Sequence, residues 1–320
     1  MDKLIVCVAL NPLLDKICTY KNITMDEHNS IIDQNINIGG TEIEAIRTIK
    51  LLQGEPNAIG FLGGLNGRYI KNFLDKNRIK SDFLWVNGET TLNTTYIDLT
   101  NNNTIKFHEK GIIIQEKDIL RLKRNFEMSI KDSSVILLNT SLSKEFNNKV
   151  FQEMIATAKR YNIKTVLHTS GESLVEGIKA QPYSVVLERE NLKELNIKEE
   201  NSQKILEKVH ELLVKNSIHY IALNLYDDAL YTISKNKICK VSIDNKYNFI
   251  KSEIGMSAFI GAFALCIERK YEIEKTTKIS MAASSAAAKN FDTDILFKKS
   301  EVDYSAKKYK IKEIMNKNNM

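Results

Sequence analysis

Proline and glycine are scarce in this chain, and neither forms a linker. Only three prolines occur among the 320 residues, at Pro12, Pro56 and Pro182, and no Pro-rich or Gly-rich stretch divides the sequence. Internal repeats are also absent. With 43% hydrophobic and 27% charged residues, the chain is too apolar to be disordered. Length permits one large domain or two smaller ones. Because no boundary is marked, we expect residues 1–320 to form a single domain.

Cysteine pairs and long hydrophobic runs are missing as well. The four cysteines are far apart, at Cys7, Cys18, Cys239 and Cys266. None forms a CxxC pair, so we predict reduced, mostly buried thiols rather than disulfides or a zinc site. The apolar run 4–10 is too short for a signal-peptide core or a membrane span, and no later stretch approaches twenty apolar residues. We therefore expect a cytoplasmic protein that has no membrane partner.

An excess of charge of one sign is nearly absent. The chain has 46 basic and 40 acidic residues, a formal net charge of +6. Much of the excess lies in the last residues, where a lysine-rich end is typically solvated. No helix-turn-helix, zinc-finger or aromatic–basic pattern occurs, so we predict no nucleic-acid partner. The five histidines have no metal-ligand spacing, and we predict no metal site from them. The GxxxxGK[ST], GxSxG and HExxH motifs are all missing.

What the sequence does contain is an alternation of short apolar runs and amphipathic patterns. Strand-like runs occur at 4–10, 57–62, 134–138, 163–168, 184–187 and 219–225. Helical patterns occur at about 42–53, 67–77, 116–130, 145–161, 202–216, 257–268 and 272–290. The strand runs are apolar throughout, as in strands that are buried on both faces. This alternation predicts an α/β fold with a parallel sheet covered by helices on both faces.

Two stretches, at about 16–38 and 89–109, interrupt that alternation. Their strand-like runs have polar or one-sided faces. The three asparagines at 101–103 suit a hairpin turn inside the second stretch. We interpret these stretches as the strands of a small second sheet that forms a lid beside the main one.

Several polar and small residues follow the predicted strands. Asp15 comes shortly after the first strand, where side chains of an open α/β sheet face the ligand crevice. Gly39 and Gly40 open a predicted helix, and Gly63 belongs to a second Gly-rich junction at 60–67. Glycines at such junctions let a ligand approach free backbone N–H groups. Taken singly, a capped turn or a plain glycine turn explains each feature equally well.

Together these segments resemble the phosphofructokinase-B branch of the ribokinase-like family, closest to 1-phosphofructokinases and tagatose-6-phosphate kinases. Four strings match in family order. Residues 9–16 (ALNPLLDK) resemble TLNPALDK, 60–67 (GFLGGLNG) resemble GFLGGxNG, 168–174 (HTSGESL) resemble DTSGEAL, and 180–183 (AQPY) resemble AKPY.

The resemblance implies a three-layer αβα fold with a mostly parallel central sheet and a small β-lid that often clasps a second subunit. It therefore implies a homodimer through the lid. It also implies phosphoryl transfer from ATP, with magnesium, to a sugar-phosphate hydroxyl. The candidate substrate-binding residues are Asp15, Gly39, Gly40, Gly63 and Asn93.

The sequence departs from the family at positions that contact substrate and phosphates. The lysine and asparagine of the family's GGKGxN are Thr41 and Glu44 here, and the phosphate-holding arginine of TRxN is Thr91. The metal and phosphate motif NxxE aligns with Glu188 and Asn191, which exchange the two residue types. The two cations that would hold a sugar phosphate are therefore absent from their family positions.

The nucleotide and catalytic motifs are altered too. The family's SLGxxG begins here at Asn224 and has Tyr226 in place of its first glycine. Its GAGD corresponds to Glu253 through Met256, and only Gly255 is kept. The family's aspartate is the general base, and losing such a base typically slows a reaction by about 10²- to 10⁴-fold. A Glu253 carboxylate about 4 Å from a phosphate would repel it by about 4 kcal/mol at an effective dielectric near 20.

Three functional hypotheses follow. In the first, the chain keeps the kinase fold but has lost or severely reduced ATP-dependent transfer, and it acts as a binding or regulatory pseudokinase. In the second, it is an active sugar-phosphate kinase with a divergent site. In the third, another class of enzyme uses the old pocket through His168, Asp15 or Glu188. The sequence assigns no catalytic residue and no cofactor beyond those that the resemblance implies.

Overall fold

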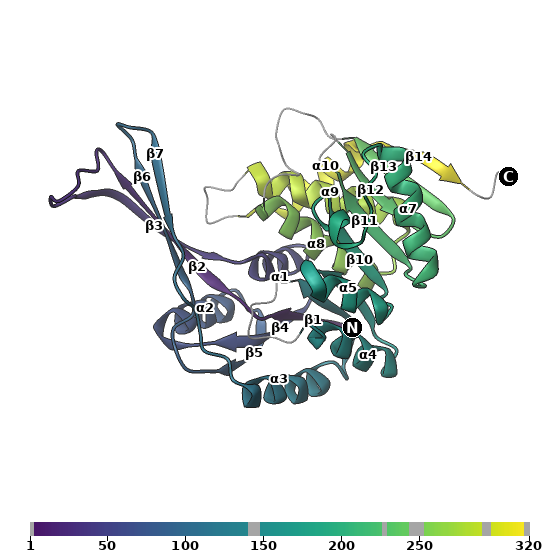
Figure 1. The fold of residues 1–320 in the computed structure, drawn as a ribbon, viewed down its shortest axis with the longest axis horizontal. Helices are drawn as coiled ribbons and strands as arrows, with labels where there is room; N and C mark the ends of the chain where they lie inside the picture. Colours follow the sequence, from purple (N-terminus) through teal and green to yellow (C-terminus); the bar gives the residue numbers. More distant parts are fainter. Residues whose placement is uncertain (1–2, 140–147, 226–228, 243–252, 290–295, 317–320) are drawn as a thin grey trace.

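The computed structural model describes residues 3–139, 148–225, 229–242, 253–289 and 296–316. These residues form a large α/β body from which a narrow four-stranded sheet projects (Figure 1). The expected α/β fold, with a large mostly parallel sheet and a smaller second sheet, is confirmed.

The main sheet is parallel in its centre and antiparallel at one edge. From edge to edge its described strands are β14 (Ile311–Asn316), β13 (Lys237–Ser242), β12 (Ala229–Ile233), β11 (Tyr220–Asn224), β10 (Ser184–Glu188), β9 (Lys164–His168), β8 (Ser133–Asn139), β1 (Leu4–Ala9), β4 (Pro56–Leu62) and β5 (Lys80–Trp85). The strands from β11 to β5 pair in parallel, whereas β12, β13 and β14 pair antiparallel. The carboxyl ends of the parallel strands therefore share one edge of the body.

Helices cover both faces of this sheet and bury two apolar clusters. One cluster packs under α1 (Thr41–Leu51), α2 (Gly64–Lys76), α8 (Glu253–Glu268), α9 (Ile273–Lys289) and α10 (Lys299–Lys308). The other packs under α3 (Glu116–Ser129), α4 (Val150–Arg160), α5 (Gly171–Lys179), α6 (Asn191–Glu194) and α7 (Ser202–Lys215). Along β1, Ile5 and Cys7 enter the first cluster and Val6 and Val8 the second. This alternation produces the three-layer architecture.

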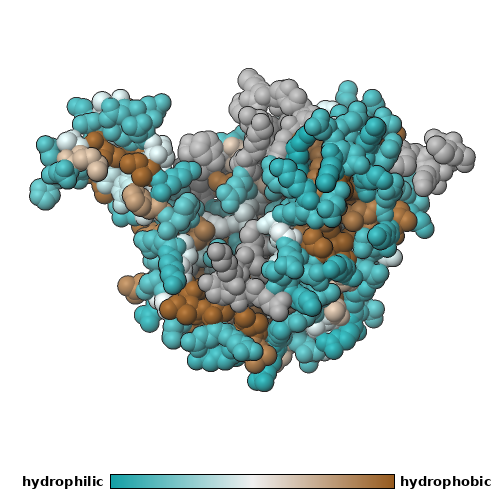
Figure 2. Space-filling model, in the orientation of Figure 1, coloured by the Kyte–Doolittle hydropathy of each residue, from teal (hydrophilic) through white to brown (hydrophobic). Residues whose placement is uncertain are grey.

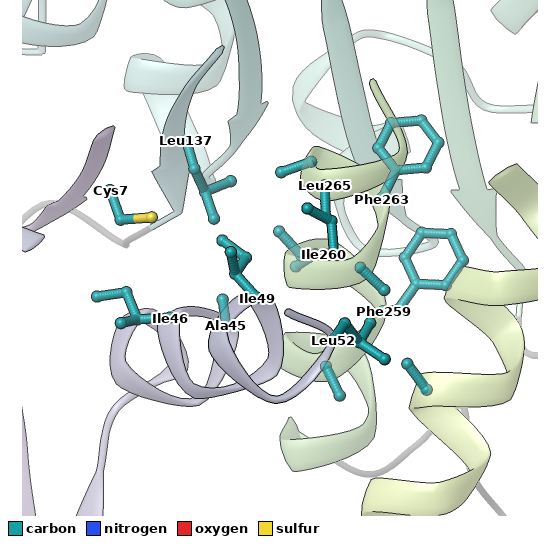
Figure 3. Close-up of a cluster of buried hydrophobic side chains, with 14 of the residues drawn as sticks. Cys7, Ala45, Ile46, Ile49, Leu52, Leu137, Phe259, Ile260, Phe263 and Leu265 are labelled. Atoms are coloured by element: carbon teal, nitrogen blue, oxygen red, sulfur yellow. The ribbon is translucent and has the colours of Figure 1, made fainter. Parts of the chain in front are cut away.

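Close packing of α1 against α8 forms the centre of the first cluster (Figure 3). The two helices approach closely at Gly261, where an added Cβ would lie 2.4 Å from the carbonyl oxygen of Ala45. Ile46 and Ile49 of α1 belong to the same apolar cluster as Ile260 of α8. The fixed contact sets where the first turns of both helices lie relative to the sheet, and both turns carry motif residues.

The second sheet has the order β3–β2–β6–β7 and is called the lid below. It consists of β2 (Leu13–Tyr20), β3 (Ile31–Gly39), β6 (Leu92–Asp98) and β7 (Asn103–Phe107). Asp98 pairs with Asn103 across the asparagine turn, which confirms the expected hairpin. Leu14 and Ile38 at the base of the lid join the first apolar cluster, so the lid is anchored to the body at that end.

The structure corrects three helix boundaries and adds several elements. The helix expected at 67–77 begins at Gly64, and the helix expected at 145–161 begins at Val150 in the described residues. The helix expected at 257–268 begins earlier, at Glu253, and the Ser257 hydroxyl donates to the Glu253 carbonyl oxygen at 2.8 Å within its first turn. The elements not expected from the sequence are β5, the antiparallel strands β12 to β14, and helices α5, α6 and α10. These are short elements, and their pattern was too brief to separate from loops.

The four cysteines are buried free thiols, as expected. Among the described residues, no helix has the length and apolar character that crossing a membrane requires.

Candidate functional site

A row of polar residues crosses all four strands of the lid at one register. Asp15 on β2 pairs with Asn37 on β3 and with Asn93 on β6. Thr94 pairs with Phe107, so the next position in register with Asn93 is His108, just beyond β7. Side chains in register across neighbouring strands lie on the same face of a sheet. Residues from two distant parts of the sequence therefore form one polar face.

Hydrogen bonds connect three members of this row. The Asn93 Nδ2 donates to Asp15 Oδ1 at 3.3 Å. The Asn93 Oδ1 lies 3.2 Å from His108 Nδ1. Since the amide oxygen is an acceptor, Nδ1 is the donor, and the arrangement selects the imidazole form that carries a proton on Nδ1. Nε2, the second ring nitrogen of His108, takes no part in this hydrogen bond.

Gly39 gives Asp15 room to take this position. A Cβ added at Gly39 would lie 2.1 Å from Asp15 Oδ2 and 2.7 Å from Leu13 Cδ1. Gly40 follows with a positive φ of 92°, a backbone conformation that suits glycine, at the N-cap of α1. The space that Asp15 needs and the positive φ at Gly40 therefore explain why glycines stand where the lid meets the body.

The environment of Asp15 opposes ionisation in one respect and favours it in others. Burial raises the pKa of Asp15, while the Asn93 hydrogen bond and the charges of His108 and Lys106 lower it. The net pKa lies above the ordinary value, so burial is the larger effect. Asp15 therefore places on the polar face a carboxyl group whose ionisation burial opposes and two nearby basic side chains favour.

Two carboxylates, Glu42 and Glu44, lie in the first turn of α1, close to this face. Glu42 Oε1 accepts a hydrogen bond from the Asn11 backbone N–H at 3.3 Å. Glu44 Oε1 pairs with Arg47 Nη1 at 2.9 Å, but its Oε2 is buried with no hydrogen-bond partner among the described residues. Burial raises the pKa of Glu44, Arg47 lowers it, and the nearby Asp15 raises it further. Glu44 is therefore an electrostatically costly group beside the candidate ligand site.

A second polar row follows the carboxyl ends of the main sheet. Asn139, His168, Glu188 and Asn224 are the last residues of β8, β9, β10 and β11. Asn139 pairs in register with His168, and Glu188 pairs with Asn224. The four strands therefore place their terminal side chains in one line at the edge where open α/β sheets bind ligands.

His168 bridges its two neighbours in this row. Its Nδ1 lies 2.8 Å from Asn139 Oδ1, and its Nε2 lies 3.3 Å from Glu188 Oε1. Asn139 Nδ2 in turn donates to the Thr41 carbonyl oxygen at 2.9 Å. This chain of contacts runs from the first turn of α1 to the end of β10. Asp15 bonds to Asn93 instead, so the three residues of the third hypothesis lie in two separate hydrogen-bonded networks.

Glu188 and Asn191, which the resemblance aligns with the family's magnesium and phosphate motif, do not fit a magnesium site in this arrangement. Magnesium selects free oxygen ligands in octahedral geometry. Glu188 Oε1 faces His168, and Asn191 Oδ1 accepts the Glu188 backbone N–H at 2.9 Å. The Asn191 amide nitrogen donates to Glu194 Oε2 at 3.2 Å. We assign neither residue as a metal ligand and derive no catalytic step through magnesium.

Met256, which the resemblance aligns with the family's base, is buried in the first apolar cluster and is only 6% exposed. Its Sδ lies 4.0 Å from the Nδ2 of Asn224 at the end of β11. Gly255 is buried beside it, whereas Glu253 is exposed at the start of α8. The expected repulsion by an inward-facing Glu253 is therefore not supported. The nucleotide-motif residue Tyr226 lies outside the described residues.

The glycine-rich junction before α2 is filled by the chain itself. The Glu89 carboxylate accepts the backbone N–H groups of Leu65 and Asn66, each at 3.2 Å. An added Cβ at Gly64, where φ is +62°, would lie 2.0 Å from that carboxylate. The Gly63 N–H donates to Thr90 Oγ1 at 2.9 Å. The amides that were expected to receive a ligand here already have acceptors, because an acidic side chain suits a helix N-terminus.

Thr91 holds the base of the lid. Its carbonyl oxygen accepts the Leu14 N–H at 2.9 Å, and an added Cβ at Gly111 would lie 2.4 Å from its Oγ1. It offers no positive charge. The residue types at Thr41 and Thr91 predict no cation there, but Lys106 and His108, which the motif comparison does not include, act on Asp15 through their charges. Two basic residues alternating with Phe107 in a predicted lid strand were the available signal.

Comparison with known proteins agrees with this architecture. Residues 3–221 match the family model described as "pfkB family carbohydrate kinase". The chain is 25% identical over 285 residues to a 1-phosphofructokinase of Borreliella burgdorferi, covering 89% of this chain and 92% of the relative. It is 28% identical over 246 residues to a tagatose-6-phosphate kinase of Staphylococcus epidermidis, covering 76% and 78%.

Solved structures show the same fold. Phosphofructokinase-2 from Escherichia coli, solved in complex with fructose-6-phosphate, superposes with a TM-score of 0.84 at 17% identity and covers 96% of this chain and 99% of that one. A mostly parallel sheet between two helix layers, with a polar lid beside its carboxyl edge, defines a ribokinase-like carbohydrate-kinase fold. The chain belongs to the pfkB family of carbohydrate kinases.

Proposed function

We propose that this protein binds a sugar phosphate between its lid and the body but transfers phosphoryl groups from ATP very poorly, so that it serves as a binding or regulatory member of its family. The observation that carries the proposal is Met256. Its buried thioether lies beside Asn224, at the position that the resemblance aligns with the family's base. A thioether is too weak a base to accept the hydroxyl proton in phosphoryl transfer.

The row at the sheet edge supports the proposal. His168 and Glu188 pair with each other at 3.3 Å where the resemblance expects an aspartate and a metal-linked asparagine. A histidine that engages this carboxylate occupies an oxygen that a divalent cation would otherwise use as a ligand. Catalysis of phosphoryl transfer depends almost entirely on positioning and charge stabilisation, so changes of this kind affect the reaction itself.

The polar face of the lid supports retained carbohydrate binding. Asp15 and Asn93 are hydrogen-bonded to each other, and Gly39 leaves space for the carboxylate. Carboxylate and amide groups that converge on one face are suited to sugar hydroxyls, which both donate and accept hydrogen bonds. These residues match family positions, unlike those at the phosphoryl-transfer centre.

The alternative is an active sugar-phosphate kinase with a divergent site. Family membership favours it, and so do the names of the relatives, a 1-phosphofructokinase and a tagatose-6-phosphate kinase. The experiment that separates the two is a coupled assay of ATP consumption with fructose 1-phosphate or tagatose 6-phosphate. We expect no saturable turnover and little thermal stabilisation by millimolar Mg-ATP, since only a ligand that binds the native state raises stability. Saturable turnover with either substrate would establish the alternative.

We also propose that the protein forms a homodimer through the lid. Tyr96 packs against Tyr20 and Phe107, with ring centroids 5.9 Å and 5.5 Å apart. Ile105 is 46% exposed and Phe107 54% exposed. Register places these side chains on the face opposite Asp15, and hydrophobic residues gather on the projecting arm in Figure 2. An apolar sheet face of this kind is suited to packing on its own copy.

A cytoplasmic location remains part of the proposal.

A further inference from the structure

Two basic side chains of the lid, Lys106 and His108, lie on the face that carries Asp15. Lys106 pairs in register with Thr95 on β6, and Thr95 pairs with Ile17 on β2. Ile17 is two residues from Asp15 and so points to the same side of the sheet. His108 reaches this side as well, because its Nδ1 bonds to Asn93. The polar face therefore combines hydroxyl-binding groups with two sources of positive charge.

The electrostatics place both basic groups close to Asp15. Each lowers the pKa of the Asp15 carboxyl, with His108 having the larger influence. Within the described ranges neither side chain forms a salt bridge. Their charges are thus not cancelled by direct ion pairs, although Asp15 lies in the same field.

Arg47, a cation of helix α1, is committed elsewhere. Arg47 is held by Glu44 at 2.9 Å and lies over the Phe73 ring at 5.3 Å from its centroid. Thr41 and Thr91 stand at the two positions where the family resemblance expects a cation. On this face, Lys106 of β7 and His108 just beyond β7 are therefore the basic groups that an anionic ligand can use.

We propose that Lys106 and His108 bind the anionic group of a sugar phosphate whose hydroxyls contact Asp15 and Asn93. This inference rests on the proposed function, in which the polar face binds a sugar phosphate. Neighbouring strands lie about 4.8 Å apart, so the row from Asp15 to His108 extends over roughly 10 Å. One monosaccharide phosphate can occupy that row with its ring at β2 and β6 and its phosphate at β7.

The two side chains suit different parts of this task. The Lys106 ammonium is a mobile point charge with three donors, which tolerates several phosphate orientations. His108 is oriented by Asn93 through Nδ1, so its Nε2 has a defined direction for a hydrogen bond to a phosphate oxygen when the ring is protonated. Charge-assisted contacts of this kind are the stronger class of hydrogen bonds.

The test is isothermal titration of the full-length protein with fructose 1-phosphate and tagatose 6-phosphate, and with fructose and tagatose as the unphosphorylated probes. The variants are Lys106→Gln, His108→Gln and the double variant. The matched control is Lys21→Gln, which removes the same charge from the lid one residue beyond the end of β2, roughly 20 Å along the strand from Asp15.

We expect Lys106→Gln to weaken binding of the sugar phosphate by about 10-fold or more, the usual loss for a charge-assisted contact. Lys21→Gln should change it by less than about twofold, since exposed charges beyond a Debye length are screened. In the double variant the preference for the phosphorylated over the unphosphorylated sugar should fall sharply, while affinity for the unphosphorylated sugar stays the same.

Three results would overturn the inference. They are an unchanged preference in the double variant, an equal loss in Lys21→Gln, and no saturable binding of either sugar phosphate to the unmodified protein at millimolar concentration. The ATP-consumption assay is scored separately. Turnover in that assay would defeat the non-catalytic function while leaving the assignment of Lys106 and His108 to be judged by the titrations alone.

Discussion

The Sδ of Met256 lies 4.0 Å from the Nδ2 of Asn224, which brings the first turn of α8 into contact with the carboxyl end of β11. Both residues are buried, and Met256 is part of the continuous apolar cluster under α1 and α8. The position that the resemblance aligns with a phosphoryl-transfer centre is therefore buried in the interior of the protein.

This contact leads to a prediction about Met256→Asp. The variant should remain without saturable ATP-dependent turnover, because Thr41, Thr91 and the His168–Glu188 pair are unchanged. It should also unfold at a lower temperature, since a carboxylate replaces a buried apolar side chain. The coupled ATP assay and differential scanning fluorimetry measure the two outcomes. Met256→Leu, a swap of similar volume, is the control and should cost less than about 1.5 kcal/mol. Robust turnover in Met256→Asp would mean that the rest of the site is competent.

Glu44 provides a prediction about pH. Its folded-state pKa is raised by burial, so between the ordinary value of 4.5 and that raised pKa the folded protein holds a proton that the unfolded chain releases. The free energy of unfolding therefore falls as pH rises through this window. Glu44→Gln removes the effect and keeps an oxygen acceptor for Arg47. Relative to the unmodified protein, the variant should gain melting temperature as pH rises from about 4.5 to 8.

Glu55→Gln is the matched control for this titration. Glu55 pairs with Lys50 at 3.1 Å beyond the other end of α1 and is about half exposed. Its melting temperature should differ little from that of the unmodified protein, as expected for a surface pair. A melting temperature of Glu44→Gln that keeps a constant difference from that of the unmodified protein at every pH would show that Glu44 ionises without penalty in the folded state.

Gly39→Ala should disturb Asp15 directly. The new Cβ would lie 2.1 Å from Asp15 Oδ2, so either the carboxylate or the strand must move. We expect a loss of about 1–3 kcal/mol in the free energy of unfolding, as for other overpacked sites, measured by urea denaturation. In an Asp15→Ala background the same substitution should cost less, because the clashing carboxylate is gone. Equal costs in both backgrounds would place the strain elsewhere, for example on Leu13.

The exposed apolar face of the lid predicts the oligomeric state. Phe107→Glu should convert a dimer into a monomer, since a charge buried in an apolar interface without a partner is costly. Light scattering coupled to size-exclusion chromatography measures the mass. The control is Leu120→Glu on α3, which changes an exposed leucine of similar accessibility outside the lid. A monomeric unmodified protein, or a dimer that survives Phe107→Glu, would contradict lid-mediated assembly.

Much of the architecture was predictable because it depends on local pattern. Apolar runs such as 57–62 indicated strands buried on both faces, and β4 spans Pro56–Leu62. The lid strands were recognisable because polar faces interrupt that pattern. The antiparallel strands β12 to β14 were missed, since short runs with central polar residues, such as Lys240 in β13, do not differ clearly from loops.

The candidate site was predictable only in part. Asp15, Asn93 and the Met256 position came from strings that resemble a family. The partners His108, Asn139 and Glu89 did not, because each acts through a contact between distant segments. The Glu89 carboxylate, for example, caps α2 across a separation of 23 residues from Asn66. No periodicity in the sequence indicates such a pair.

By itself the amino-acid sequence determined the alternation of buried strands and amphipathic helices, the second sheet, and the residue types at the positions that the resemblance aligns with the family's motifs. These are properties of residue type and spacing, which the chain carries before it folds. The tertiary structure alone decided which charges meet: it set the register that aligns Asp15, Asn93 and His108, and it paired His168 with Glu188. The physical reason is that pairing between strands depends on how the whole sheet packs, and a shift of one residue would turn each of these side chains to the opposite face.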